Sequence, residues 1–386
     1  MNTALRPYGP AKPPVPLAQK LMRIDWTLAI LITLIACAGF MMLYSAAAGS
    51  IWPWAGRQMI RFVFAFAIFL AVACVDLRVW LGLAYPAYWI SFALLVAVEV
   101  AGHVGLGAQR WIEFGPLALQ PSELMKIALI LALARYLHGL PPNEVSRPSK
   151  LVQPLLMVAA PVVLVLMQPN LGTATILALC GATLLFLAGL SWYWIGSAFA
   201  AIAVAVPTAW EFLLHDYQRQ RVLTFLHPDQ DALGAGWNIT QAKIALGSGG
   251  LAGKGFLLGT QSRLNFLPES QTDFILPMVG EEFGFLGTMV LLVIFSMVIY
   301  HGIQIAMRSR SQFGRLLAMG ITVNFFLYIM INGLMVMGLI PVVGIPMPLI
   351  SYGGTAMMTV MFGFGLLMSV RVHRQVDVPR HAGGMI

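Results

Sequence analysis

The sequence predicts an all-α polytopic membrane protein with ten transmembrane helices and a large extracytoplasmic loop between the seventh and eighth helices. Hydrophobic residues make up 59% of the 386 positions and charged residues only 10%, whereas a soluble domain carries about 25% charged residues. Apolar stretches recur at membrane length, and a helix needs about 20 such residues to cross the hydrocarbon core. The alternating segments typical of a barrel are not seen, so helices are the expected spanning elements.

The chain divides into two tails and one membrane domain. Residues 1–25 hold five prolines and four basic side chains, which predicts a disordered cytoplasmic tail. Residues 26–372 form the expected ten-helix domain, with the polar run 215–276 as its large loop, and residues 373–386 form a second cytoplasmic tail. The ten expected spans are 26–47, 58–75, 79–101, 120–138, 151–167, 171–189, 192–213, 277–301, 315–339 and 351–371.

The basic residues predict the orientation. Of the 23 Lys and Arg residues, 14 lie on the side of the N-terminus, with only four carboxylates beside them. Positively charged loops mark the cytoplasmic side of a membrane protein. We therefore expect the chain in the inner (cytoplasmic) membrane, with both termini in the cytoplasm. The net charge of +8 then reflects topology and does not indicate a nucleic-acid partner.

Several irregular segments gather on the outer side. The same count places 215–276 there, together with 102–119, 168–170 and 340–350. The last segment contains three prolines and precedes a Gly-Gly pair, so it cannot form a regular helix. Non-helical backbone at membrane depth must be buried in protein or line a wet cavity, and we expect one outward-facing cavity here.

Asp273 stands where the polar loop re-enters the membrane, four residues after Glu269. One interpretation is an N-cap, in which its carboxylate accepts backbone N–H groups at the start of the eighth span. The other is a general base at the membrane–water boundary, with its pKa adjusted by partial desolvation. The two roles are compatible.

Lys126 lies within the fourth span, where a lone charge costs roughly 2.5–3.5 kcal/mol on insertion scales. Glu123, three residues earlier, shares its helical face and is the expected partner. The pair could simply close the helical bundle. Its place near the outer end of the span favours a cation that faces an anionic ligand or the catalytic carboxylate.

Cations are scattered over the outer segments. Solvated loop charges are one interpretation, and a cavity for a phosphate or diphosphate group is the other. These cations are Arg110, Arg219, Arg221, Lys243, Lys254 and Arg263. The glycine-rich run 247–255 resembles a phosphate loop, but Ser248 replaces its first glycine and Gly255 its Ser/Thr. This excludes a nucleotide cofactor, and the glycines are expected to allow tight turns and close approach to a ligand.

A series of motifs follows in order along nearly the whole chain beyond the N-terminal tail. The motifs are Gln109-Arg110-Trp111, Gln120-Pro121-Ser122-Glu123, Asp216-Tyr217-Gln218-Arg219-Gln220-Arg221, Gly253-Lys254-Gly255, Gly259-Thr260-Gln261, Leu267-Pro268-Glu269, Thr272-Asp273-Phe274, Glu281-Glu282-Phe283-Gly284 and Ser351-Tyr352-Gly353-Gly354. Together they resemble the SEDS family (shape, elongation, division and sporulation). The Gly-Lys-Gly and Gly-Thr-Gln elements are similar to its RodA (elongation) branch. One departure is Asn170, which stands where the family usually has Asp in a Gln-Pro-Asp turn.

The resemblance implies a ten-helix glycosyltransferase that polymerises lipid II into peptidoglycan strands during elongation and rod-shape maintenance. Its implied partner is a class B penicillin-binding protein that supplies the transpeptidase. In the family the Asp matching Asp273 is essential, and the residues matching Glu123 and Lys126 are important. A divalent cation, Mg²⁺ or Mn²⁺, could assist, with Asp273 as a possible ligand. The expected substrate-binding residues are Arg110, Arg219, Arg221, Lys254, Gln261, Glu269 and Ser351.

Three alternatives stay open. A lipid II flippase would use Glu123 and Lys126 along a hydrophilic path, although the inner halves of the helices hold few polar residues. A division polymerase of the FtsW branch would share the chemistry. A scaffold that only recruits the penicillin-binding protein would tolerate substitution of Asp273.

Overall fold

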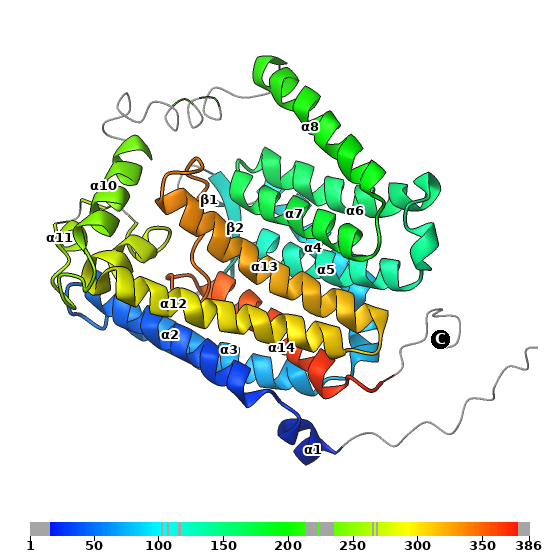
Figure 1. Ribbon diagram of the computed structural model, residues 1–386, viewed down its shortest axis with the longest axis horizontal. Helices are drawn as coiled ribbons and strands as arrows, with labels where there is room; N and C mark the ends of the chain where they lie inside the picture. Colours follow the sequence, from blue (N-terminus) through cyan, green and yellow to red (C-terminus); the bar gives the residue numbers. More distant parts are fainter. Residues whose placement is uncertain are drawn as a thin grey trace, which may run out of the picture.

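The computed structural model describes residues 16–376, apart from 102, 106–107, 115–116, 213–218, 220–222, 224–234, 265 and 268. Its helices pack side by side around a shared apolar interior (Figure 1). The elements are α1 (Leu17–Met22), α2 (Trp26–Ala46), α3 (Ala55–Cys74), α4 (Leu77–Ala101), β1 (His103–Gly105), β2 (Ala108–Phe114), β3 (Leu117–Leu119), α5 (Pro121–His138), the 3-10 turn η1 (Pro142–Glu144), α6 (Pro148–Met167), α7 (Leu171–Leu187), α8 (Trp192–Phe212), α10 (Ala235–Ser248), α11 (Thr260–Arg263), α12 (Ile275–Arg308), α13 (Gln312–Val336) and α14 (Gly354–Val372).

Seven of the described helices are long and apolar enough to cross a membrane: α2, α3, α4, α6, α12, α13 and α14. The prediction of a helical membrane protein is therefore confirmed in its coarse form: the architecture is predominantly helical. Helices α5, α7 and α8 occupy the other three expected positions, although α7 has only 17 residues and α5 carries three charged side chains. The count of ten spans stays a prediction.

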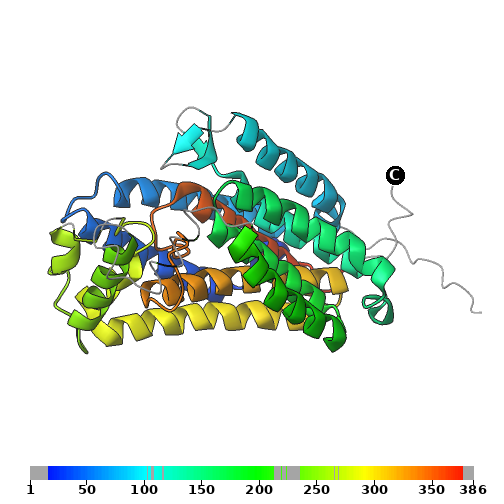
Figure 2. The ribbon, with the colours of Figure 1, turned by 90° about the horizontal axis from the view of Figure 1, so that it is seen from above.

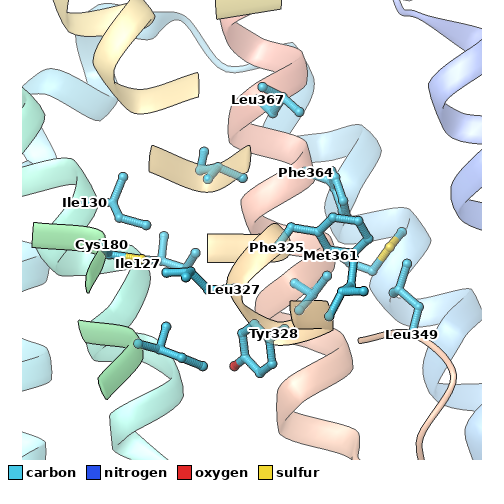
Figure 3. Packing of buried hydrophobic residues seen from close by; sticks show 14 of the residues in the cluster. Ile127, Ile130, Cys180, Phe325, Leu327, Tyr328, Leu349, Met361, Phe364 and Leu367 are labelled. Carbon is cyan, nitrogen blue, oxygen red and sulfur yellow. The ribbon is translucent and has the colours of Figure 1, made fainter. Parts of the chain in front are cut away.

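Helix α5 lies at the centre of the bundle, where most of its side chains are buried. Its sequence suits both ends, because Pro121 fits the first turn and Glu123 there complements the positive end of the helix dipole. Arg135 and His138 complement the negative end in the same way. Figure 3 shows the interior beside this helix, where side chains such as Ile127, Phe325 and Phe364 fill the space between neighbouring helices.

Two segments differ from their expected structure. The end of the segment expected to be a disordered tail forms α1, and Lys20 Nζ donates to the Cys74 carbonyl oxygen at 2.8 Å. This contact satisfies a carbonyl that the end of α3 leaves free. The segment 102–119, expected on the outer side, contains a three-stranded antiparallel sheet in the order β1-β2-β3, seen as short cyan arrows along the upper edge of Figure 2. Strands this short leave too little alternation to be recognised in the sequence.

Helix α12 is broken at Gly284, whose φ of 67° and ψ of −162° are not helical. The glycine-rich run satisfies the backbone groups around the break through four hydrogen bonds. These are Lys254 N to Glu281 O at 2.9 Å, Gly255 N to Glu282 O at 3.0 Å, Phe285 N to Gly250 O at 2.9 Å and Leu286 N to Leu251 O at 3.0 Å. In the structure these glycines approach the backbone of α12, and their expected approach to a ligand stays a prediction. Glycines allow this contact since they carry no Cβ.

The break leads to a first prediction. A Cβ at Gly253, where φ is +81°, would lie 2.1 Å from the Glu282 carbonyl oxygen. Gly253→Ala should therefore lower the free energy of unfolding by at least about 2 kcal/mol, through the clash and the strained backbone. Thermal unfolding in detergent measures this loss. Gly247→Ala is the matched control, because a Cβ there meets nothing within 4 Å, and an equal loss in both variants would contradict the prediction.

Candidate active site

Asp273 lies in the turn that precedes α12, and neighbouring elements hold the backbone of this turn. Asn332 Nδ2 in α13 donates to the Asp273 carbonyl oxygen at 2.8 Å. Ser351 Oγ donates to the Thr272 carbonyl oxygen at 2.5 Å, and the Tyr352 N–H donates to Gln271 O at 2.8 Å. The segment 340–350 that leads to Ser351 is irregular, as its prolines predicted. The turn is thus fixed from two sides.

The Asp273 carboxylate itself does not cap α12. The N-cap of that helix is Phe274, which makes no side-chain capping hydrogen bond, so the capping interpretation is wrong. No residue that the structure describes donates a hydrogen bond to the carboxylate, while Asp273 Oδ2 lies 3.3 Å from where Gly344 would carry a Cβ. A side chain at Gly344 would crowd this oxygen.

The surroundings change the protonation of Asp273. Burial raises the pKa of this carboxyl to about 7, and the negative charge of Glu269 adds to the increase. The Arg110 guanidinium opposes it and lowers the pKa. Desolvation and like charges both disfavour the ionised form, and a carboxyl poised near neutrality can exchange a proton with a substrate. Glu269 itself is exposed, with a φ of +55°.

Arg110 confirms that the outer segments converge. Its Nε donates to the Gln168 carbonyl oxygen at 3.1 Å, and its terminal nitrogen donates to Pro169 O at 2.5 Å. Because Arg110 also acts on Asp273, strand β2, the 168–170 turn and the Asp273 turn meet at one place. In that turn Asn170 Oδ1 caps α7 by accepting the Thr173 N–H at 3.3 Å. Asn and Asp serve equally well at this position.

Lys254 and Gln261 bind a different carboxylate. Lys254 Nζ donates to Glu281 Oε1 at 2.7 Å, and the Gln261 N–H lies 3.2 Å from each Glu281 oxygen. Glu281 is fully buried and lies about two helical turns after Asp273. These two residues, expected to bind substrate, hold the loop to α12 in this structure.

Glu123 and Lys126 form the expected ion pair, with Lys126 Nζ 2.6 Å from Glu123 Oε1. Tyr328 of α13 completes the group: its hydroxyl donates to Glu123 Oε2 at 2.6 Å and also accepts from Lys126. Figure 3 shows Tyr328 among the buried side chains. All three residues are less than 5% exposed, so here the pair faces Tyr328 and not an opening.

The remaining expected residues are placed as follows. Arg219 is partly buried, and Arg221 lies outside the described residues. The hydroxyl of Ser351 hydrogen-bonds to backbone groups: it donates to the Thr272 carbonyl oxygen and accepts the Met347 N–H at 2.8 Å. In the part of the chain that the structure describes, no three His, Cys, Asp or Glu side chains group in a way that could hold a metal ion.

Sequence reasoning missed four polar residues of the membrane helices. Gln58 Nε2 donates to the Ser351 carbonyl oxygen at 3.0 Å, and Arg61 stacks on the Tyr352 ring at 4.9 Å. Asn332 and Tyr328 are the others. The available signal was a polar or charged side chain inside an apolar stretch, which is costly and usually functional or paired.

Comparison with known proteins identifies the family of the chain. The model of the FtsW/RodA/SpoVE family, described as cell cycle protein, matches residues 20–376. The peptidoglycan glycosyltransferase MrdB of Escherichia coli (strain K12) is 45% identical over 322 residues, which cover 83% of this chain and 86% of that protein. The stage V sporulation protein E of Bacillus subtilis is 34% identical over 367 residues, covering 90% and 96%.

Solved structures resemble the whole fold. A chain from a study of how a peptidoglycan synthase complex coordinates polymerization and crosslinking has a TM-score of 0.81 and 31% identity, covering 92% of this chain and 99% of that chain. The rod shape determining protein RodA of Thermus thermophilus has a TM-score of 0.70 and 28% identity, covering 92% and 98%. Since the family model spans almost all of the described residues, the chain belongs to the FtsW/RodA/SpoVE family of cell cycle proteins.

Proposed function

We propose that this chain is a peptidoglycan glycosyltransferase of cell elongation that polymerises lipid II, with Asp273 as its general base. The activity is that of its MrdB relatives, which are named peptidoglycan glycosyltransferases. The observation that supports the role of Asp273 is a partly buried carboxyl with a pKa of about 7, at the meeting point of the outer segments.

The reaction is a single displacement at a sugar carbon. Asp273 takes the proton from the acceptor sugar hydroxyl as this oxygen attacks the anomeric carbon of the donor. The bond between that carbon and the diphosphate oxygen breaks, and its electron pair leaves with undecaprenyl diphosphate. One displacement inverts the anomeric centre. The diphosphate leaving group supplies the driving force, so no nucleotide is needed.

Cations near the site stabilise the charge that grows on the leaving diphosphate. Arg110 is fixed by the two carbonyl oxygens that it binds, and Arg61 is held against the Tyr352 ring. The described residues do not fit a metal cage built by the protein alone. Mg²⁺ is commonly held by one or two carboxylates plus substrate phosphates, and Asp273 and Glu269 could supply these. No step above requires the ion.

The same proposal includes the arrangement in the membrane. Helices α5, α7 and α8 would complete ten spans, with both termini in the cytoplasm and Asp273 on the outer side. The excess of basic residues on the side of the termini supports this orientation. A class B penicillin-binding protein is the proposed partner, supported by the resemblance to a synthase complex that couples polymerization to crosslinking.

The direct test is polymerisation of labelled lipid II by the purified protein with its penicillin-binding partner. Glycan polymer should form without any nucleotide, and a parallel reaction with a chelator decides whether a divalent cation is needed. The same preparation in vesicles tests the flippase alternative. Lipid translocation without polymer would replace the proposal.

The pKa of Asp273 predicts the pH dependence of this reaction. A general base must be ionised, so kcat/KM, which reports the pKa of the free enzyme, should rise with pH through an acidic limb near pH 7 and be lost below it. An ordinary Asp would place this limb near pH 4. The kcat/KM profile for polymer formation between pH 4 and 9 measures it, and a flat profile from pH 5 upward would contradict the role of Asp273.

A further inference from the structure

The amide of Asn332 joins the two segments that form the site. Asn332 lies in the outer part of α13 and is fully buried. Its Nδ2 donates one hydrogen bond to the Asp273 carbonyl oxygen at 2.8 Å and another to the Ile345 carbonyl oxygen at 2.7 Å. Because both acceptors are carbonyls, the nitrogen of the amide must point at them. One side chain therefore fixes the Asp273 turn and the 340–350 segment relative to each other.

We propose that Asn332 is a positioning residue, which holds the Asp273 turn in the orientation that proton abstraction requires. The inference rests on the proposed function of Asp273 as general base. Asn332 acts through the peptide of Asp273 and does not itself touch the substrate. Its bond to Ile345 also fixes the segment that carries Gly344, the residue beside Asp273 Oδ2.

The side-chain oxygen of Asn332 supports a functional role for this residue. Asn332 Oδ1 is buried and has no hydrogen-bond partner among the described residues. Leaving such an acceptor unsatisfied costs about 1–3 kcal/mol, which an apolar side chain of similar size would avoid. An amide at this position therefore costs folding free energy. Its contribution to the structure is the pair of hydrogen bonds that its nitrogen donates.

A second buried amide acts on the same turn indirectly, through Ser351. Gln58 of α3 is fully buried, its Nε2 donates to Ser351 O at 3.0 Å, and its Oε1 has no partner among the described residues. Ser351 Oγ in turn donates to Thr272 O. Asn332 thus holds the Asp273 peptide directly. Gln58 instead holds the backbone of Ser351, whose hydroxyl holds the Thr272 peptide. A displacement of about 1 Å in a reacting group can cost 10²-fold in rate, so such rigidity has a direct use.

Asn332→Leu is the sharpest test, because leucine has the same branched shape and removes the unsatisfied oxygen. The variant should fold, while kcat for lipid II polymerisation falls about 10- to 100-fold and KM changes less than about twofold. The freed turn admits water to the Asp273 carboxyl, so the acidic limb of kcat/KM should shift from about pH 7 towards lower pH. A purely structural role would leave that limb in place.

Asn324→Ala is the matched control, since it removes an amide from the same helix about two turns away. Asn324 Oδ1 accepts from Cys180 Sγ at 3.8 Å and makes no contact with the Asp273 turn. This variant should keep the wild-type kcat and pH limb per folded molecule. If Asn332→Leu does the same while Asp273→Asn is inactive, the inference fails and the proposed function stands.

The double variant Asn332→Leu/Asp273→Asn shows whether Asn332 acts through Asp273 or independently of it. If Asn332 acts through Asp273, adding Asn332→Leu to Asp273→Asn should lower the residual rate no further. An additional loss equal to that of the single variant would show an independent role and overturn the inference. Full activity of Asp273→Asn alone would overturn the proposed function and this inference together.

Discussion

Asp273→Asn is expected to lower kcat for glycan polymerisation by about 10²–10⁴-fold, the usual contribution of a general base. Asparagine has the same shape but cannot accept the proton of the sugar hydroxyl. The contacts that hold the turn use backbone atoms of residues 271–273, so they survive the change. KM for lipid II should therefore change little, and polymer formation per folded molecule measures the loss.

The same variant should be more stable than wild type at neutral and alkaline pH. The folded pKa of Asp273 lies near 7, above its ordinary value of 3.8, so ionisation disfavours the folded state. This penalty is absent below pH 4, grows between pH 4 and 7, and is constant above pH 7. Thermal unfolding of Asp273→Asn against wild type should show a gain that follows this pH window.

Glu144→Gln is the control for loss of a carboxylate. Glu144 forms a surface pair with Arg147 at 3.1 Å, and such pairs contribute little to stability. Its removal should leave both kcat and the pH dependence of unfolding unchanged. A normal rate for Asp273→Asn, with Glu144→Gln equally active, would exclude Asp273 as the base.

Lys126→Met is expected to lower the free energy of unfolding by about 3–5 kcal/mol, the effect of leaving one member of a buried ion pair without its partner. Glu123 would keep the hydroxyl of Tyr328 but lose the ammonium group 2.6 Å from its Oε1. Thermal unfolding in detergent, together with the yield of folded protein, measures this loss. Lys150→Met, at the exposed start of α6, is the control for removing a lysine.

A double variant distinguishes a structural role of the Glu123–Lys126 pair from a catalytic one. Glu123→Gln combined with Lys126→Met removes both charges and should recover most of the lost stability, because buried ion pairs are often replaceable by neutral groups. If the pair only closes the bundle, the double variant recovers activity as well. If Lys126 serves an anionic ligand in another state of the enzyme, stability returns without activity. No recovery of stability would contradict the ion-pair account.

The sequence predicted those features that depend on short separations. Helices at the expected positions followed from apolar length, and the Glu123–Lys126 pair followed from its i, i+3 spacing. The irregular segment before Ser351 followed from its prolines. The convergence of Arg110 on Asp273 followed from counting spans, which places both on one side of the membrane.

Other features depend on contacts between distant residues and could not be read from local patterns. Tyr328 reaches Glu123 from 205 positions away, and Asn332 reaches Asp273 from 59. Lys254 was expected to bind substrate as one of several cations on the segments expected outside the membrane. In the fold the break at Gly284 needs hydrogen-bond partners, and that need arises only once α12 and the loop lie together.

The break at Gly284 also separates the first turns of α12 from the rest of the helix. This short piece begins at the Asp273 turn, and its other end is hydrogen-bonded to residues 250–255. A shift of residues 250–255 would therefore tilt this piece of helix and move the Asp273 carboxyl. The position of residues 250–255 thus bears on the geometry at Asp273 through backbone hydrogen bonds alone.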